Sequence, residues 1–192
     1  MLSVRTLRRS CSVRPDWNHI IDGRWTLFLD RDGVVNHRII DGYVTSWDEF
    51  EFLPGALEAF QVFAQRFRYI IIVTNQQGVG KGLMTMEAVD TIHDRMCLEV
   101  EAHDGRIDGI LVCPQLATDP DNYRKPSPEM AYMAQELFPD IDLGKSVMVG
   151  DGVTDIEFGR NAGTKTVFIG HDNALADDCC TSLIEFANLL KQ

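Results

Sequence analysis

The sequence predicts an α/β fold: a single Rossmann-like domain with a central parallel sheet flanked by helices and no large cap domain. Short apolar runs of strand length alternate along the chain with longer segments in which apolar residues recur at helical spacing. The run at 69–73 is continuously apolar, which is typical of a strand buried on both faces of a parallel sheet. A chain of 192 residues, 45% of them hydrophobic, suits one core.

The strands and helices are expected to alternate from residue 26 onward. The strands are expected at 26–29, 69–73, 109–114, 146–151 and 166–170. Pro54 stands at a favoured first helical position, Thr85 is a good N-cap, and Ser127 caps a helix that Pro128 starts. The helices are expected from Pro54 to Phe67, from Thr85 to near Gly105, from Ser127 to Leu137, from the segment 152–155 to near Gly163, and from Thr181 to Leu190.

The folded domain is expected to span residues 23–192, after an N-terminal extension at 1–22. Residues 1–15 carry four arginines, several serines and no acid, which is the composition of an organelle transit peptide. A disordered basic tail or a start codon placed too early explains the same composition. The segment from Trp17 to Trp25 is interpreted as an approach to the first strand, with a turn at Asp22-Gly23.

Charge and cysteine content narrow the partners and the compartment. A net charge of −11 disfavours general attraction to nucleic acid or to an anionic membrane, although a local cluster of amides and bases can still bind an anionic substrate. Five scattered cysteines without a C-x-x-C pair fit a reducing compartment, and no apolar run reaches transmembrane length. We therefore expect a cytoplasmic protein without nucleic-acid or membrane partners, as a monomer or small homo-oligomer.

Two familiar loop motifs are excluded by their spacing. The segment 78–82 is not a Walker A loop, because that motif needs glycine at Gln76 and Ser or Thr at Gly82; its glycines indicate a mobile loop. A calcium loop starting at Asp30 would need its glycine where Val35 stands. The histidines at 93 and 103 have no partner at metal-ligand spacing and are interpreted as surface residues.

Polar side chains gather where the expected strands end. The carboxyl ends of parallel strands meet at one edge of a sheet, where ligands bind. A carboxylate at such an end is a candidate nucleophile or metal ligand, and a second one just beyond it is a candidate acid and base. Two cations before a helix N-terminus are placed to meet an anion. These candidates are Asp30 and Asp32 after the first strand, Thr74 and Asn75 after the second, Arg124 and Lys125 before a helix, and Asp151 and Asp155 after the fourth.

The set of motifs in this order resembles the haloacid dehalogenase (HAD) superfamily of phosphohydrolases, over about residues 26–170. The matching pieces are Asp30-Arg31-Asp32-Gly33, Val73-Thr74-Asn75, Arg124-Lys125-Pro126 and Gly150-Asp151-Gly152-Val153-Thr154-Asp155. Each piece is weak alone, and the ordered set is highly specific. More narrowly, the chain looks like the branch that holds histidinol-phosphate phosphatases and D,D-heptose 1,7-bisphosphate phosphatases.

The resemblance implies a role for each candidate. Asp30 would attack phosphorus and form an aspartyl-phosphate, while Asp32 would act as general acid and base. Thr74 and Lys125 would hold the phosphoryl oxygens. Mg²⁺ would bind the Asp30 and Asp151 carboxylates and the Asp32 backbone carbonyl. Asp155 would support Lys125, and Asn75 and Arg124 would contact the substrate.

One departure from that branch concerns a zinc loop. Members often bind zinc through a Cys-x-His pair and a Cys-x-Cys pair before the Arg-Lys-Pro. Here Cys113 matches the first ligand, but Gln115 replaces the histidine, and Asp121 and Tyr123 stand near the later pair. We therefore expect no zinc and a loop from 115 to 123 that protein contacts alone hold.

The expected activity is Mg²⁺-dependent hydrolysis of a small phosphorylated metabolite, such as a sugar phosphate or histidinol phosphate. The intervals between the motifs hold no cap domain, so the site should be open. A phosphotransferase is the alternative on the same fold, although it would need a cap to protect the intermediate. A non-catalytic binding protein is the other alternative, although all the candidate catalytic residues are present.

Overall fold

A parallel six-stranded sheet in the order β3-β2-β1-β4-β5-β6 forms the centre of the computed structural model, which describes residues 14–191. This is the strand order of the Rossmann fold, in which the order of the parallel strands reverses between β1 and β4. The α/β prediction is therefore confirmed. The strands are β1 Thr26–Leu29, β2 Tyr69–Asn75, β3 Gly109–Cys113, β4 Ser146–Gly150, β5 Lys165–Ile169 and β6 Asp178–Cys180.

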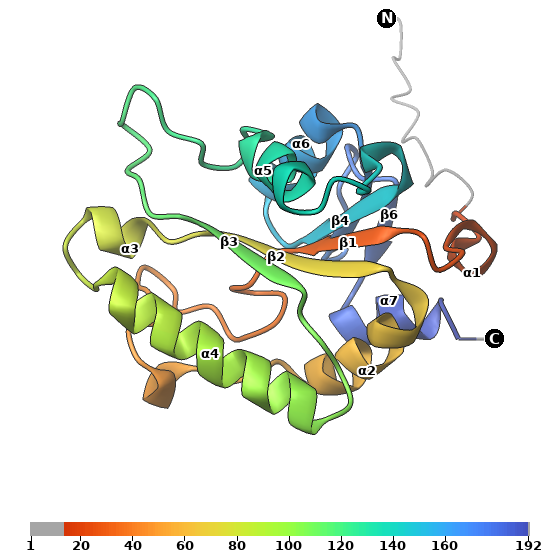
Figure 1. Ribbon diagram of the computed structural model, residues 1–192, viewed down its shortest axis with the longest axis horizontal. Helices are drawn as coiled ribbons and strands as arrows, with labels where there is room; N and C mark the ends of the chain where they lie inside the picture. The colour runs from red at the N-terminus through yellow and green to blue at the C-terminus, as the bar shows by residue number, and fades with distance from the viewer. Residues whose placement is uncertain (1–13, 192) are drawn as a thin grey trace, which may run out of the picture.

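Helices cover both faces of the sheet (Figure 1). Successive β1 side chains point to opposite faces: Leu27 and Leu29 join the larger hydrophobic cluster, under α2, α4 and α7, and Phe28 joins the smaller one, under α5 and α6. All of β1 is buried, as a strand at the centre of a three-layer fold must be. The helices are α1 Trp17–Ile20, α2 Ala56–Arg66, α3 Gln77–Gly80, α4 Met86–Ala102, α5 Glu129–Leu137, α6 Val153–Ala162 and α7 Leu183–Asn188.

Most element boundaries lie within a few residues of the predicted ones, and the differences have local causes. Thr85 is the N-cap of α4 and accepts a hydrogen bond from the Ala88 amide, as expected. Helix α2 begins two residues after Pro54, because Gly55 adopts a left-handed conformation first. The glycine segment expected to be a mobile loop forms the one-turn helix α3, and the short edge strand β6 was not predicted.

Part of the expected N-terminal extension is packed against the domain. Trp17 and Ile21, four residues apart, are both buried, and the Trp17 ring meets Phe186 of α7 edge-on at 5.6 Å. The Arg66 guanidinium also donates to the Ile21 carbonyl at 2.9 Å. The packed structure thus begins before residue 23; the expectations for residues 1–13 lie outside the described residues.

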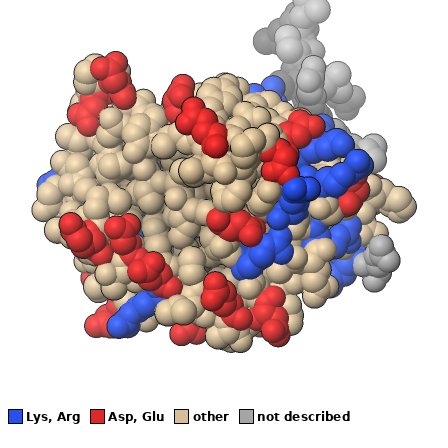
Figure 2. All heavy atoms as spheres, in the orientation of Figure 1, with Lys and Arg blue, Asp and Glu red and all other residues tan. Residues whose placement is uncertain are grey.

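No separate cap covers the carboxyl edge of the sheet in residues 14–191. The segment between β1 and α2 contains a short 3₁₀ helix, Trp47–Glu49, and a small aromatic cluster in which Trp47 stacks on Phe50 at 5.0 Å. None of the helices in residues 14–191 has the length and apolar character needed to span a membrane. On the face shown in Figure 2, acidic side chains are dispersed, whereas most Lys and Arg side chains gather toward one end.

Candidate active site

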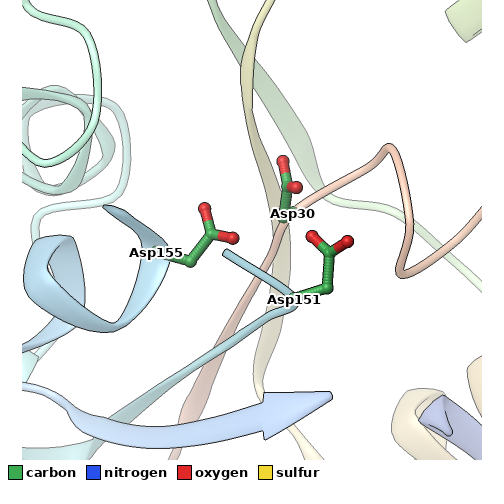
Figure 3. Close-up of side chains that lie close together, drawn as sticks. All are labelled: Asp30, Asp151 and Asp155. Carbon is green, nitrogen blue, oxygen red and sulfur yellow. The ribbon is translucent and has the colours of Figure 1, made fainter. Parts of the chain in front are cut away.

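Three carboxylates lie close together at the crevice between β1 and β4, where the order of the parallel strands reverses. Asp30 follows β1, Asp151 follows β4, and Asp155 lies in the first turn of α6. Their oxygen atoms lie within 4.8 Å of one another, and Figure 3 shows the three side chains turned toward a common space. Parallel strands bring residues distant in sequence to this crevice, which is where open α/β sheets bind ligands.

A buried lysine neutralises part of this cluster. Lys125 Nζ lies 2.7 Å from Asp30 Oδ1 and 2.7 Å from Asp155 Oδ1, and it donates to the Val73 carbonyl at 2.7 Å. Its side chain is only 2% exposed. The Asn75 side chain holds the Lys125 backbone, accepting from its amide at 3.0 Å and donating to its carbonyl at 3.3 Å. The ammonium group is therefore fixed at the end of β2.

The charges in the cluster do not balance without a further cation. Burial, with the Asp155 carboxylate as the next cause, raises the pKa of Asp30 to about 7. Burial likewise raises the pKa of Asp151 to about 6. Although burial disfavours the charged lysine, Asp155 and Asp30 raise the pKa of Lys125 above its usual value, so it stays protonated. Within this cluster one ammonium group faces three carboxylates, so the cluster favours the binding of a further cation.

The Arg38 guanidinium lies where these carboxylates face the solvent. Its Nη2 atom donates to the Asp32 carbonyl at 2.8 Å and to Asp151 Oδ1 at 2.7 Å, and it lies 3.7 Å from Asp30 Oδ2. The same three oxygen-bearing groups suit Mg²⁺, which prefers oxygen ligands. Gly33 has φ of 92°, and a Cβ there would collide with the Asp151 carboxylate. The donors present therefore fit a divalent cation.

The Asp32 carboxylate is held by several donors at the edge of the site. Arg31 Nη2 donates to both of its oxygens at 2.9 Å, and Asn36 donates to Oδ1 at 3.0 Å. Gln76 Nε2 donates to Asp32 Oδ2 at 2.8 Å and to Thr74 Oγ1 at 2.9 Å. Burial opposes ionisation, but Arg31 and the other donors lower the pKa of Asp32 below its usual value.

A cavity of about 510 Å³ opens beside these groups. Arg38, Lys81 and Arg124 bring positive charge to its wall, and Asp41 brings negative charge. Arg124 Nη1 is buried without a hydrogen-bond partner among the described residues. The cavity also contains the expected catalytic and binding residues Asp30, Asp32, Thr74, Asn75, Lys125 and Asp155.

Known proteins are similar to this chain in both sequence and fold. A family model described as HAD-hydrolase-like matches residues 122–184. The D-glycero-alpha-D-manno-heptose-1,7-bisphosphate 7-phosphatase of Mycobacterium tuberculosis is 38% identical over 171 residues, which cover 85% of this chain and 90% of that protein. The chain belongs to the HAD-like phosphatases.

Other members of this phosphatase family agree with that assignment. The D-glycero-D-manno-heptose-1,7-bisphosphate 7-phosphatase of Chlorobaculum tepidum is 33% identical, with coverage of 76% of this chain and 79% of that protein. The crystal structure of the D,D-heptose 1,7-bisphosphate phosphatase of Bordetella bronchiseptica, complexed with magnesium and phosphate, has a TM-score of 0.78 and 30% identity. The alignment covers 86% of this chain and 97% of that one.

The phosphatase site brings together all the residues that the sequence suggested, but it uses Asn75 in an unexpected way. Both ends of the Asn75 amide contact the Lys125 backbone, so this geometry favours positioning of the lysine over the expected substrate contact. Asp155 contacts Lys125, in line with the expected supporting role. Sequence reasoning missed Arg38, Lys81 and Gln76. Only Gln76, directly after the polar end of β2, carried a signal that could have found it.

His93 is buried, and the interpretation of it as a surface residue was wrong. It lies on the inner face of α4 with Val89, Ile92 and Met96, and only 5% of it is exposed. Val89, Ile92 and Met96 recur at helical spacing in the sequence, so this face could be predicted. The burial of His93 could not, because its partner, Arg31, lies in a distant loop.

The loop between β3 and α5 is held by hydrogen bonds among its own residues. Gln115 Oε1 accepts from the Tyr123 amide at 3.1 Å and lies 3.8 Å from Cys113 Sγ. The Tyr123 hydroxyl donates to the Val112 carbonyl at 3.1 Å. Asp119 Oδ2 accepts from the Leu116 amide at 2.9 Å. Gln115 and Tyr123 thus contact each other in the loop for which the sequence led us to expect no zinc; the absence of zinc stays a prediction.

Proposed function

We propose that this phosphatase hydrolyses one phosphate ester of a small sugar bisphosphate in a Mg²⁺-dependent reaction that proceeds through an aspartyl-phosphate on Asp30. The observation that carries the proposal is the convergence of Asp30, Asp151 and Lys125 at one crevice, beside a cavity with further cationic walls. The named relatives act on heptose 1,7-bisphosphates, which belong to the same substrate class.

In the first step, an Asp30 oxygen attacks phosphorus and the bond from phosphorus to the ester oxygen breaks. Asp32 gives its proton to the leaving alkoxide; because Arg31 and the other donors lower the pKa of Asp32 in the free site, it must take up this proton before the transfer. Lys125 supports this step because its ammonium group is fixed beside Asp30, where negative charge must be balanced during transfer. The Thr74 hydroxyl, which also lines the cavity, is placed to hold a phosphoryl oxygen.

In the second step, water attacks the phosphorus of the aspartyl-phosphate, Asp32 takes a proton of that water, and the bond from phosphorus to the Asp30 oxygen breaks, which frees the Asp30 carboxylate and inorganic phosphate. The Asp30 and Asp151 carboxylates and the Asp32 carbonyl would hold Mg²⁺, which would supply positive charge to the transferring phosphoryl group. Arg38 must then leave the position it takes between these groups. It would be released next to the cavity, where it could meet a second phosphate.

The cavity wall favours a bisphosphate over histidinol phosphate. Arg38, Lys81 and Arg124 can compensate a second phosphate, whereas they would repel the ammonium group of histidinol phosphate. The open site also supports hydrolysis over transfer to another acceptor, because no cap in the described chain excludes water from the intermediate.

The direct test is phosphate release from a panel of esters, with Mg²⁺ and with EDTA. We expect a sugar bisphosphate to give the highest kcat/KM, sugar monophosphates less and histidinol phosphate least, and we expect EDTA to abolish turnover. Asp30→Asn should lower kcat by at least about 10³-fold, because the nucleophile is lost. Asp48→Asn, at an exposed acid in the 3₁₀ helix, is the matched control and should leave kcat unchanged. Turnover that survives in EDTA or in Asp30→Asn would refute the mechanism.

A further inference from the structure

A buried arginine separates the two aspartates that the proposed mechanism uses. Only 1% of the Arg31 side chain is exposed. Its Nη2 atom donates to both oxygens of Asp32 at 2.9 Å, and its Nη1 atom lies 3.1 Å from His93 Nε2 on α4. Its Nε atom has no hydrogen-bond partner among the described residues. The guanidinium therefore connects the Asp32 carboxylate with a histidine on a different element.

The chemistry of the pair fixes the form of the histidine. Arginine has only donors, so His93 Nε2 must present its lone pair to Arg31, and the ring proton must be on Nδ1. Burial, together with the Arg31 charge, lowers the pKa of His93 to about 3, which keeps the ring neutral. A neutral acceptor at this place is the one group on α4 that hydrogen-bonds to Arg31 in the described structure.

The contact matters because the guanidinium of Arg31 has few other hydrogen bonds. Its Nη2 atom donates to both Asp32 oxygens, and Nε has no hydrogen-bond partner among the described residues, so His93 is the acceptor that fixes the orientation of the buried guanidinium on the side away from Asp32. Proton transfer requires the Asp32 carboxyl within hydrogen-bond reach of the ester oxygen, and a small displacement is costly in rate. Asn36 and Gln76 each hold one oxygen of Asp32, but neither fixes the guanidinium.

We propose that His93 is a positioning residue for proton transfer: through Arg31 Nη1 it fixes the guanidinium that orients the Asp32 carboxyl toward the leaving group. The inference rests on the proposed function. Neither His93 nor Arg31 gives or takes a proton. The proton passes from Asp32 to the ester oxygen as the bond from phosphorus breaks.

The test compares two leaving groups in the intact enzyme with Mg²⁺. An alkyl phosphate releases a strongly basic alkoxide that needs the Asp32 proton, whereas p-nitrophenyl phosphate releases a phenolate that needs little help. We compare their kcat/KM values, because these report the steps up to formation of the aspartyl-phosphate. His93→Phe should lower kcat/KM by about 10- to 100-fold for the alkyl ester and by less than about threefold for the aryl ester.

Conservative variants separate positioning from packing. His93→Gln places a carbonyl oxygen near the position of Nε2 and should restore most of the alkyl activity. His93→Asn is too short to reach Arg31 and should behave like His93→Phe. Met96→Ala, one turn further along α4, creates a cavity in the same core and should lower stability without changing the ratio of alkyl to aryl activity.

Equal losses on both esters, an unchanged ratio in His93→Phe, or no rescue by glutamine would overturn the inference while leaving the proposed phosphatase intact. Failure of the unmodified protein to release phosphate from these two esters and from every sugar phosphate of the panel would overturn the proposed function itself. A measurement independent of the variants is the ¹⁵N spectrum of the His93 ring in the intact protein. We expect the Nδ1–H tautomer, and a protonated Nε2 would contradict the contact with Arg31.

Discussion

Lys125 is a buried charge whose place depends on two carboxylates. Its ammonium group lies 2.7 Å from Asp30 and 2.7 Å from Asp155, with almost no exposure to solvent. A buried ion pair adds little net stability, but removal of one partner leaves the other charge unpaired. The lysine therefore controls the electrostatic balance of the site, in addition to its proposed catalytic role.

Lys125→Met should lower the free energy of unfolding by about 3 to 5 kcal/mol at neutral pH in EDTA, because it leaves Asp30 and Asp155 facing each other. It should also abolish activity. Lys125→Met combined with Asp155→Asn should regain part of the stability and none of the activity. Denaturant unfolding of the single and double variants gives the coupling, and additive effects would show that the pair does not interact.

The pH dependence of stability follows from Asp151, because burial raises the pKa of this carboxyl from its usual value near 4 to about 6. Between these values the folded state binds more protons than the unfolded state, so this group contributes a loss of stability as pH rises from about 4 to 6. One pKa unit corresponds to about 1.4 kcal/mol, which solvent screening reduces for this partly exposed group.

Asp151→Asn should therefore stabilise the metal-free protein more at pH 8 than at pH 4, by a difference of about 1 to 2 kcal/mol. Thermal unfolding in EDTA at both pH values measures it. Mg²⁺ should stabilise the unmodified protein at pH 8 and should have little effect on the variant, because a ligand that binds only the folded state raises stability. An equal effect of the substitution at both pH values would refute this account of Asp151.

At the scale of elements, the loop between β3 and α5 positions Arg124 and Lys125 through its own hydrogen bonds. Gln115 joins the start of the loop to Tyr123, near its end.

Because residues 113–123 lack most of the expected zinc ligands, purified protein should contain much less than one zinc per chain by elemental analysis. About one zinc per chain would contradict the interpretation of residues 113–123.

Gln115→Ala should lower stability by about 1 kcal/mol, because one hydrogen bond to the Tyr123 amide is lost. It should raise KM for the substrate several-fold with little change in kcat, because Arg124 becomes less well positioned. Gln135→Ala is the control, since Gln135 also donates one side-chain hydrogen bond, to the Ile141 carbonyl, outside the loop. The same rise in KM in both variants would show that the loop has no special role.

The arrangement of the strands and helices also explains how much of the site and of the fold could be predicted from the sequence. Asp30 and Asp151 directly follow apolar strands and Thr74 lies at the end of one, and in a parallel sheet such positions must converge on one edge. Arg38 and Lys81 lie between elements without local pattern, so only tertiary packing decides that they reach the cavity. Strand β6, Asp178–Cys180, is three residues long and lacks an apolar run, so no local pattern predicted it. The burial of His93 was not predicted because its partner, Arg31, is 62 residues away.

For the whole molecule, the cavity differs from the rest of the chain in its balance of charge. The chain has a net charge of −11, yet the bases in the cavity lining (Arg38, Lys81, Arg124 and Lys125) match the acids there in number (Asp30, Asp32, Asp41 and Asp155). Lys81 lies over the Tyr43 ring at 5.3 Å, which keeps its charge beside the cavity without an ion pair. The cavity can therefore accept an anion although the chain as a whole is strongly acidic.

Lys81→Ala should raise KM roughly tenfold for a sugar bisphosphate, a loss of about 1.4 kcal/mol, and much less for the corresponding monophosphate. The physical reason is that only the second phosphate reaches this side of the cavity. Steady-state kinetics on the two substrates measures the difference, with exposed Lys191→Ala as control. An equal effect on both substrates would mean that Lys81 does not contact the second phosphate.

The central claim is that Asp30 carries the phosphoryl group during turnover. The most direct measurement is to quench the enzyme with acid during turnover, reduce the acyl phosphate with borohydride, and locate the product by peptide mass spectrometry. We predict homoserine at position 30 when Mg²⁺ and substrate are both present, and none when either is omitted. Reduction at another residue, or turnover without any trapped residue 30, would contradict the account.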